Sequence, residues 1–130
     1  MSDRDPLLGA VPYAAYLDLQ INDAGELWLP FRDDLIGNFH IGALHGGVVA
    51  AALECAVLVW LRRQGHAAPR TIDFTIDYLR PALSRDLHLT ATPVRIGRAV
   101  ATVRVDAWQV DRRRPVAAGH GNFGLGGPRS

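Results

Sequence analysis

The fold of this chain is decided by residues 37–61, which read GNFHIGALHGGVVAAALECAVLVWL. The stretch opens on polar residues and glycines, and 13 of the 14 residues in 48–61 are then apolar. Their alanine-rich composition favours a helix over a strand. Arg62 and Arg63, with Gly65 just beyond, are the signals expected where a helix ends. The sequence therefore predicts one long helix, apolar on nearly every side, that other structure must surround.

The segments before this helix predict a hairpin and a loop. Residues 16–31 alternate between apolar and polar side chains on both sides of NDAG at 22–25, a pattern typical of a β-hairpin. Residues 7–17 have the composition of a short helix that Pro12 interrupts. Residues 32–44 contain glycines but show no period, so a loop is predicted there.

The segments after the helix predict strands. Residues 86–96 and 99–110 are expected to pair through a turn at Gly97 and Arg98, and residues 115–125 form the last strand. Residues 71–79 alternate, with Ile72, Phe74, Ile76 and Tyr78 on one face and Thr71, Asp73, Thr75 and Asp77 on the other. Strands on both sides of a single helix predict an α+β fold with an antiparallel sheet.

Length and composition limit the classes of protein and of partner. The 130 residues suit a single domain. A net charge of +1 gives no reason to expect a nucleic-acid partner, and the basic run at 112–114 predicts a solvated turn. The single cysteine, Cys55, predicts a small core residue and a reducing compartment. The helix is too short to span a membrane and no signal peptide is recognisable, so we expect a cytoplasmic protein.

Gly46 and Gly47 stand where the predicted helix begins. The first N–H groups of a helix lack internal partners, and the helix dipole favours negative charge there. Glycines allow a ligand to approach these N–H groups closely. The position therefore suits an oxyanion such as a polarised carbonyl oxygen, although the two glycines could equally provide only a tight entry into the helix.

Glu54 is one of only two glutamates in the chain and lies inside the apolar run. A carboxylate in such surroundings is costly unless it has a partner, so a functional role is favoured over pairing with a buried arginine or capping of a loop. Glu54 follows Gly47 by seven residues, and a rise of 1.5 Å per residue separates them by roughly 10 Å along the axis. Glu54 therefore cannot reach an acyl carbon held at its own helix start, but could reach one held by a second subunit of a symmetric dimer.

Two histidines precede the helix. His45 could orient a substrate or hold the loop, and His40 is the other loop histidine. A zinc site needs three convergent ligands. Because His40, His45 and Glu54 show no recognisable ligand spacing, no metal site is predicted.

The motif LHGGVVAAALECA, followed by the strand TIDFTIDYLRPA, resembles the hotdog-fold acyl-CoA thioesterases of the phenylacetate-pathway (PaaI-like) group. The resemblance covers roughly residues 13–125. It implies a hotdog fold, in which an antiparallel sheet wraps one long central helix. It also implies a homodimer or homotetramer with active sites between subunits, an acyl-CoA substrate, and no cofactor, since coenzyme A is part of the substrate.

The resemblance further implies roles for individual residues. Glu54 acts as general base or nucleophile, and Gly47, next to Gly46, polarises the thioester carbonyl through its N–H. His45 supports the loop and the thiol side, and Asn38 positions water or the acid. Coenzyme A would lie near Arg80 and the turn at Gly97 and Arg98.

One position departs from the family pattern. The family asparagine usually stands six residues before the histidine, where this chain has Phe39, with Asn38 one residue earlier. Either Asn38 still serves through a shifted loop, or Phe39 lines the acyl pocket and the asparagine role is lost.

Two rival functions stay open at this point. Hotdog dehydratases and hydratases pair a loop histidine with a glutamate fourteen residues later, the separation of His40 and Glu54. Against this, the Pro-Gly of the dehydratase helix start is replaced here by His45, Gly46 and Gly47. The second rival is a non-catalytic acyl-CoA-binding hotdog protein, which a retained Glu54 argues against.

Overall fold

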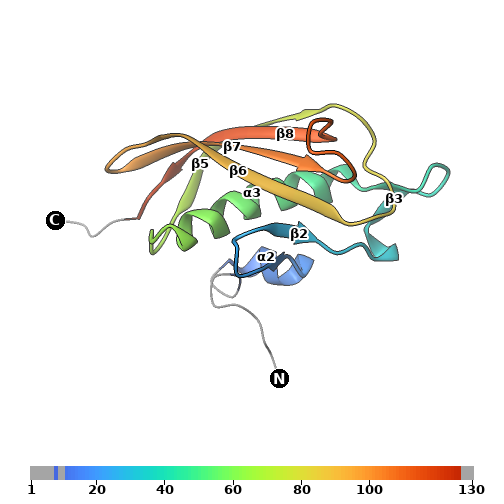
Figure 1. The fold of residues 1–130 in the computed structure, drawn as a ribbon, viewed down its shortest axis with the longest axis horizontal. Coiled ribbons are helices and arrows are strands. Elements are labelled where there is room, and N and C mark those ends of the chain that lie inside the picture. Colours follow the sequence, from blue (N-terminus) through green and yellow to red (C-terminus); the bar gives the residue numbers. More distant parts are fainter. Residues whose placement is uncertain (1–7, 9–10, 127–130) are drawn as a thin grey trace, which may run out of the picture.

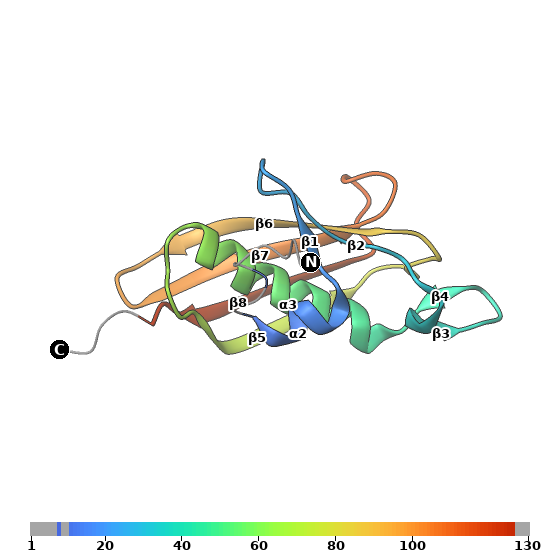
Figure 2. The same ribbon diagram turned by 90° about the horizontal axis from the view of Figure 1, so that it is seen from below.

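An 18-residue helix, α3 (Gly46–Arg63), runs through the middle of the molecule with a curved sheet on one side of it (Figures 1 and 2). The computed structural model describes residue 8 and residues 11–126. The predicted long helix is confirmed and is two residues longer at each end than the apolar run. Among the described residues, no helix is long and apolar enough to cross a membrane.

The sheet has six strands in the order β1-β2-β6-β7-β8-β5, and every neighbouring pair is antiparallel. The predicted hairpin at 22–25 and the predicted turn at Gly97 and Arg98 are both present. Strand β5 is an edge strand, because only β8 pairs with it. The strands are β1 (Gln20–Ile21), β2 (Leu27–Leu29), β5 (Arg70–Tyr78), β6 (Leu87–Ile96), β7 (Val100–Trp108) and β8 (Ala117–Gly124).

One prediction about the N-terminal third is corrected. The predicted loop at 32–44 contains a 3-10 turn, η1 (Asp33–Leu35), and a small hairpin of β3 (Ile36–Asn38) and β4 (Ala43–Leu44). These strands are too short, and their register too irregular, to leave a period in the sequence. The helix predicted at 7–17 is interrupted, since Leu8 is helical, Val11 is not, and the short helix α2 (Pro12–Leu17) begins at Pro12, where proline is favoured as the first helical residue. Residue 7 and residues 9–10 of that prediction lie outside the described residues.

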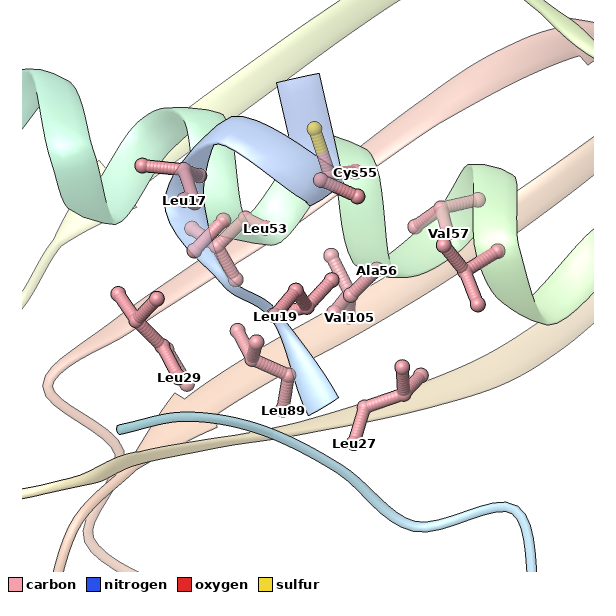
Figure 3. Packing of buried hydrophobic residues seen from close by; sticks show 14 of the residues in the cluster. Leu17, Leu19, Leu27, Leu29, Leu53, Cys55, Ala56, Val57, Leu89 and Val105 are labelled. Atoms are coloured by element: carbon pink, nitrogen blue, oxygen red, sulfur yellow. The ribbon is translucent and has the colours of Figure 1, made fainter. Parts of the chain in front are cut away.

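Apolar side chains from three layers fill the core (Figure 3). Leu17 and Leu19, from α2 and the turn after it, meet Leu53 of α3 opposite the sheet, and Val105 of β7 closes the sheet side (Figure 3). All four are 1% exposed or less. Burying a side chain of this size stabilises the fold by roughly 1.5–3 kcal/mol. The helix is apolar on nearly every side because the sheet and α2 cover it from opposite directions.

Two glycines in β8 form a slot for an aromatic ring of β5. A side chain at Gly119 or Gly121 would overlap the ring of Phe74, which packs edge-on against Phe123 at 6.0 Å between ring centroids. Strand β5 also carries Thr71 and Tyr78, which belong to the site described below.

Gly121→Ala is expected to lower the free energy of unfolding by about 2 kcal/mol. The added Cβ would collide with the backbone carbonyl of Asp73, which cannot move without breaking the β5–β8 pairing. Urea unfolding measures the change. The matched control is Gly46→Ala, whose Cβ would meet no atom nearer than 3.8 Å. Equal stability of the two variants would contradict the slot.

Candidate active site

The start of α3 is capped by the side chain of His45. The ring Nδ1 of His45 accepts a hydrogen bond from the Gly47 N–H at 3.1 Å, and His45 has the extended backbone of an N-cap residue. The Gly46 N–H has no hydrogen-bond partner among the described residues. A ligand oxygen would therefore meet one open N–H, and would have to replace His45 at the other.

Tyr78 of β5 reaches the same helix start. Its hydroxyl donates to the carbonyl oxygen of Gly46 at 2.9 Å. Gly46 and Tyr78 also line a pocket of about 290 Å³ between α3 and the segment that follows β5. The remaining lining residues are Ala43, Leu44, Val49, Leu79, Arg80, Pro81, Ala82 and Val116. The helix start thus borders an apolar pocket that can take part of a substrate.

Glu54 lies half-buried on α3 and has one hydrogen-bond donor. The hydroxyl of Thr71 donates to Glu54 Oε2 at 2.6 Å. A short charge-assisted bond of this kind fixes the orientation of a carboxylate. The other oxygen of Glu54 has no hydrogen-bond partner among the residues described, which leaves it able to accept a proton.

The contact with Thr71 corrects the predicted face pattern of this strand. Strict alternation puts Thr71 opposite Phe74, but a bulge interrupts the register between Thr71 and Asp73. The extra residue, Ile72, is 53% exposed, and Thr71 turns to the helix face together with Phe74. Bulges often re-aim side chains in this way beside active sites. The sequence carries no signal for this bulge, so Thr71 was not a predicted site residue.

Cys55, next to Glu54, is a core residue as predicted. Burial, and secondarily the charge of Glu54, raise the pKa of the Cys55 thiol to about 12. At neutral pH the thiol is therefore protonated and is a poor nucleophile.

The β3–β4 hairpin projects beyond the body of the molecule at the helix start (Figure 2). Asn38 ends β3, and Phe39 and His40 follow it in the turn. All three are exposed, Phe39 to 77%. The side-chain oxygen of Asn38 accepts the His40 N–H at 3.0 Å and so closes the turn. Gly37 lies so close to His45 that a Cβ would approach the His45 Cα to 2.8 Å, which packs the hairpin against the cap residue.

The residues predicted to contact coenzyme A fall into two places. Arg80 lies in the pocket with Gly46, and its guanidinium donates to the carbonyl of Pro115. Gly97 and Arg98 form the β6–β7 turn, at the far end of the sheet from the start of α3 (Figure 1). Within one chain, Arg80 therefore lies near the start of α3, whereas Gly97 and Arg98 lie away from the start of α3. Among the described residues, no three histidine, cysteine, aspartate or glutamate side chains gather where they could hold a metal ion.

One stripe of α3 is left half-buried. Val48, Ala51, Glu54 and Leu58 follow one another at helical spacing, so they share a face. Beside this region β5 presents an unpaired edge, with the exposed apolar side chains of Ile72 in the strand and of Leu79 just after it. A nine-residue unpaired edge is a template for pairing with another strand.

The sequence matches a known family and two named relatives. The family described as the Thioesterase superfamily matches residues 41–116. The medium/long-chain acyl-CoA thioesterase YigI of Salmonella typhimurium is 33% identical over 113 residues, which cover 74% of this chain and 73% of that protein. The protein of the same name from Escherichia coli K12 is 34% identical over 87 residues, covering 55% of this chain and 56% of that protein.

Solved structures share the fold. The Escherichia coli PaaI protein, from the phenylacetic acid degradation operon, gives a TM-score of 0.74 at 21% identity and covers 89% of each chain. A Bacillus halodurans protein solved with CoA gives a TM-score of 0.71 at 26% identity, covering 86% of this chain and 74% of that one.

Proposed function

The chain belongs to the thioesterase superfamily, has its hotdog fold and is a thioester hydrolase, and on that premise we propose that it hydrolyses acyl-CoA at sites formed between the subunits of a homodimer. The observation that carries the proposal is the bond from Thr71 to Glu54. It orients the only acid of the apolar helix and leaves one carboxylate oxygen for a proton. The relatives are named as medium/long-chain acyl-CoA thioesterases, and this name supports coenzyme A esters of medium-chain and long-chain acids as substrates.

In the proposed reaction the thioester oxygen lies at the start of α3. It replaces His45 Nδ1 at the Gly47 N–H, where the helix dipole stabilises the charge that develops on the oxygen. The displaced His45 ring is then free to face the sulfur of the leaving group. Asn38 and Phe39, on the hairpin packed against His45, stand where they could approach the substrate.

Glu54 drives the attack in one of two ways. As general base it takes a proton from water, whose oxygen bonds to the acyl carbon. The tetrahedral intermediate then expels the thiolate, which takes the proton back. As nucleophile, Glu54 attacks the acyl carbon itself, the C–S bond breaks and the coenzyme A thiolate leaves, so that a mixed anhydride forms. Water then hydrolyses the anhydride to the free acid and the Glu54 carboxylate, and the proton that this step releases goes to the thiolate. In both routes Thr71 keeps the carboxylate in one orientation.

The dimer is proposed because a single chain cannot assemble this site. Glu54 follows Gly47 by seven positions on the helix, roughly 10 Å along the axis. A partner packed against the edge of β5 would cover the half-buried stripe of α3 and bring its own helix start toward Glu54. Pairing at β5 would also satisfy the open strand edge and bury Ile72 and Leu79.

The test is thiol release from a panel of acyl-CoAs of increasing chain length. We expect stoichiometric release of coenzyme A, with medium and long chains preferred. A reagent that reacts with free thiols detects the released coenzyme A and not the protein, because Cys55 is buried and protonated. Hydration of crotonyl-CoA without thiol release would instead favour the dehydratase chemistry of His40 and Glu54. Binding without turnover would favour an acyl-CoA-binding protein.

A further inference from the structure

Tyr78 holds a peptide unit on which the proposed reaction depends. The carbonyl of Gly46, which accepts the Tyr78 hydroxyl, and the N–H of Gly47 belong to the same planar peptide group. Whatever fixes the carbonyl therefore fixes the direction of the N–H. We propose that Tyr78 is a positioning residue that aims the Gly47 N–H at the thioester oxygen. The inference rests on the proposed function, because it gives that N–H its task.

This peptide belongs to the helix, but its own sequence is permissive, so a tether from outside the helix restricts it further. Gly46 and Gly47 are both glycine, the residue with the greatest backbone freedom, and they form the first turn of the helix, where helices fray. The other side chain on this peptide is His45, which holds the N–H end. Once a substrate oxygen replaces His45, the hydroxyl of Tyr78 is the side-chain contact that still fixes the plane.

Tyr78 itself stands on a rigid base. It is the last residue of β5 and pairs with Ala117 of β8. The two residues after it, Leu79 and Arg80, both donate their N–H groups to the carbonyl of Val116, at 2.8 and 3.1 Å. The ring of Tyr78 lies over Gly46, since its nearest atom is 3.8 Å from the point where a Cβ at Gly46 would stand. The backbone that carries the hydroxyl therefore belongs to the sheet and not to the helix that the hydroxyl contacts.

The hydroxyl also strengthens the N–H as a donor. A hydrogen bond accepted at an amide carbonyl polarises the amide and makes its N–H a better donor, by roughly 10–30% per bond. This gain grows as negative charge develops on the thioester oxygen. It therefore stabilises the transition state more than the bound substrate, and should affect kcat rather than KM.

Tyr78→Phe tests the inference because it removes only the hydroxyl. We expect kcat for acyl-CoA hydrolysis to fall about fivefold with KM changed less than about twofold, the scale of one net hydrogen bond. The amide ¹⁵N resonance of Gly47 should shift, because it responds to hydrogen bonding at the preceding carbonyl. The matched control is Tyr16→Phe, which removes a hydroxyl from an exposed tyrosine of α2 and should change neither quantity.

The outcomes separate this inference from the proposed function. An active wild type with unchanged kcat in Tyr78→Phe would overturn the positioning role and leave the function standing. A lowered melting temperature with unchanged kcat would assign the hydroxyl to stability alone and also overturn it. If the wild type releases no thiol, the proposed function fails, and with it the task of the N–H, so a shifted Gly47 resonance would then show only a structural tether.

Discussion

Glu54→Gln is expected to slow thiol release from acyl-CoA by at least about a hundredfold, the loss typical when a positioned acid-base group is removed. The amide keeps the size of the carboxylate and one oxygen to accept the Thr71 hydroxyl, so the fold should survive. It cannot take a proton from water and is a very weak nucleophile, so both proposed routes fail. Steady-state kinetics with the preferred acyl-CoA measure the loss, and Glu54→Ala should match it.

The chain supplies its own control for this experiment. Glu26 is the only other glutamate, lies exposed in the β1–β2 turn and accepts the side chain of Asn22 at 2.8 Å. Glu26→Gln should keep full activity. Melting curves of all variants separate chemistry from folding. If thiol release persists in a folded Glu54→Gln protein, Glu54 is neither base nor nucleophile, and the proposed mechanism is wrong.

The strongest sequence signals were those that several neighbouring residues shared. The helix from Gly46 to Arg63 was predictable because an alanine-rich apolar run, a glycine start and basic end residues all agreed. Glu54 stood out because a charge in such a run opposes the surrounding pattern. The rise of an α-helix then set the distance from Glu54 to Gly47 without any coordinates.

The missed residues depend on contacts that local patterns do not encode. Thr71 faces Glu54 only because a bulge at Ile72 reverses the alternation, and the residues around the bulge are ordinary strand formers. Tyr78 was placed on the same strand face as Phe74, but its hydrogen bond to Gly46 joins residues 32 positions apart. Such long-range partners follow from how strand and helix pack, which periodicity does not determine.

The helix start differs from the expectation in one respect that affects the chemistry. The sequence suggested that the Gly47 N–H has no partner and is open to an oxyanion. In the structure the Gly47 N–H instead donates to His45 Nδ1 at 3.1 Å. An N-cap bond of this kind stabilises a helix by about 1 kcal/mol. Substrate binding must offset that loss, and the bond from Tyr78 to Gly46 keeps the peptide in place while His45 is displaced.

If the active site is built from two subunits, activity should be restored in a heterodimer of two variants that are each inactive alone. Gly47→Pro removes the N–H that would hold the oxyanion, and proline is tolerated in the first turn of a helix. Loss of one such donor typically costs about a hundredfold or more in kcat. Both Gly47→Pro and Glu54→Gln should therefore be nearly inactive as homodimers.

A heterodimer of the two variants should recover about half of the wild-type activity per dimer, because a two-fold arrangement exchanges elements between its sites. Glu54 of the Gly47→Pro subunit then works with the intact Gly47 of the Glu54→Gln subunit, and the second site lacks both groups. If each subunit built its own site, both sites would lack one group and the heterodimer would stay inactive.

The measurement requires co-expression with two different affinity tags and tandem purification of the heterodimer. A wild-type and Glu54→Gln heterodimer, prepared in the same way, should retain about half of the activity under either arrangement, and so calibrates the assay. The result depends on the length of the helix between Gly47 and Glu54, which keeps the two groups of one chain apart. An inactive mixed dimer beside an active calibration dimer would place both groups in a single subunit, against the separation that an offset of seven helical positions imposes.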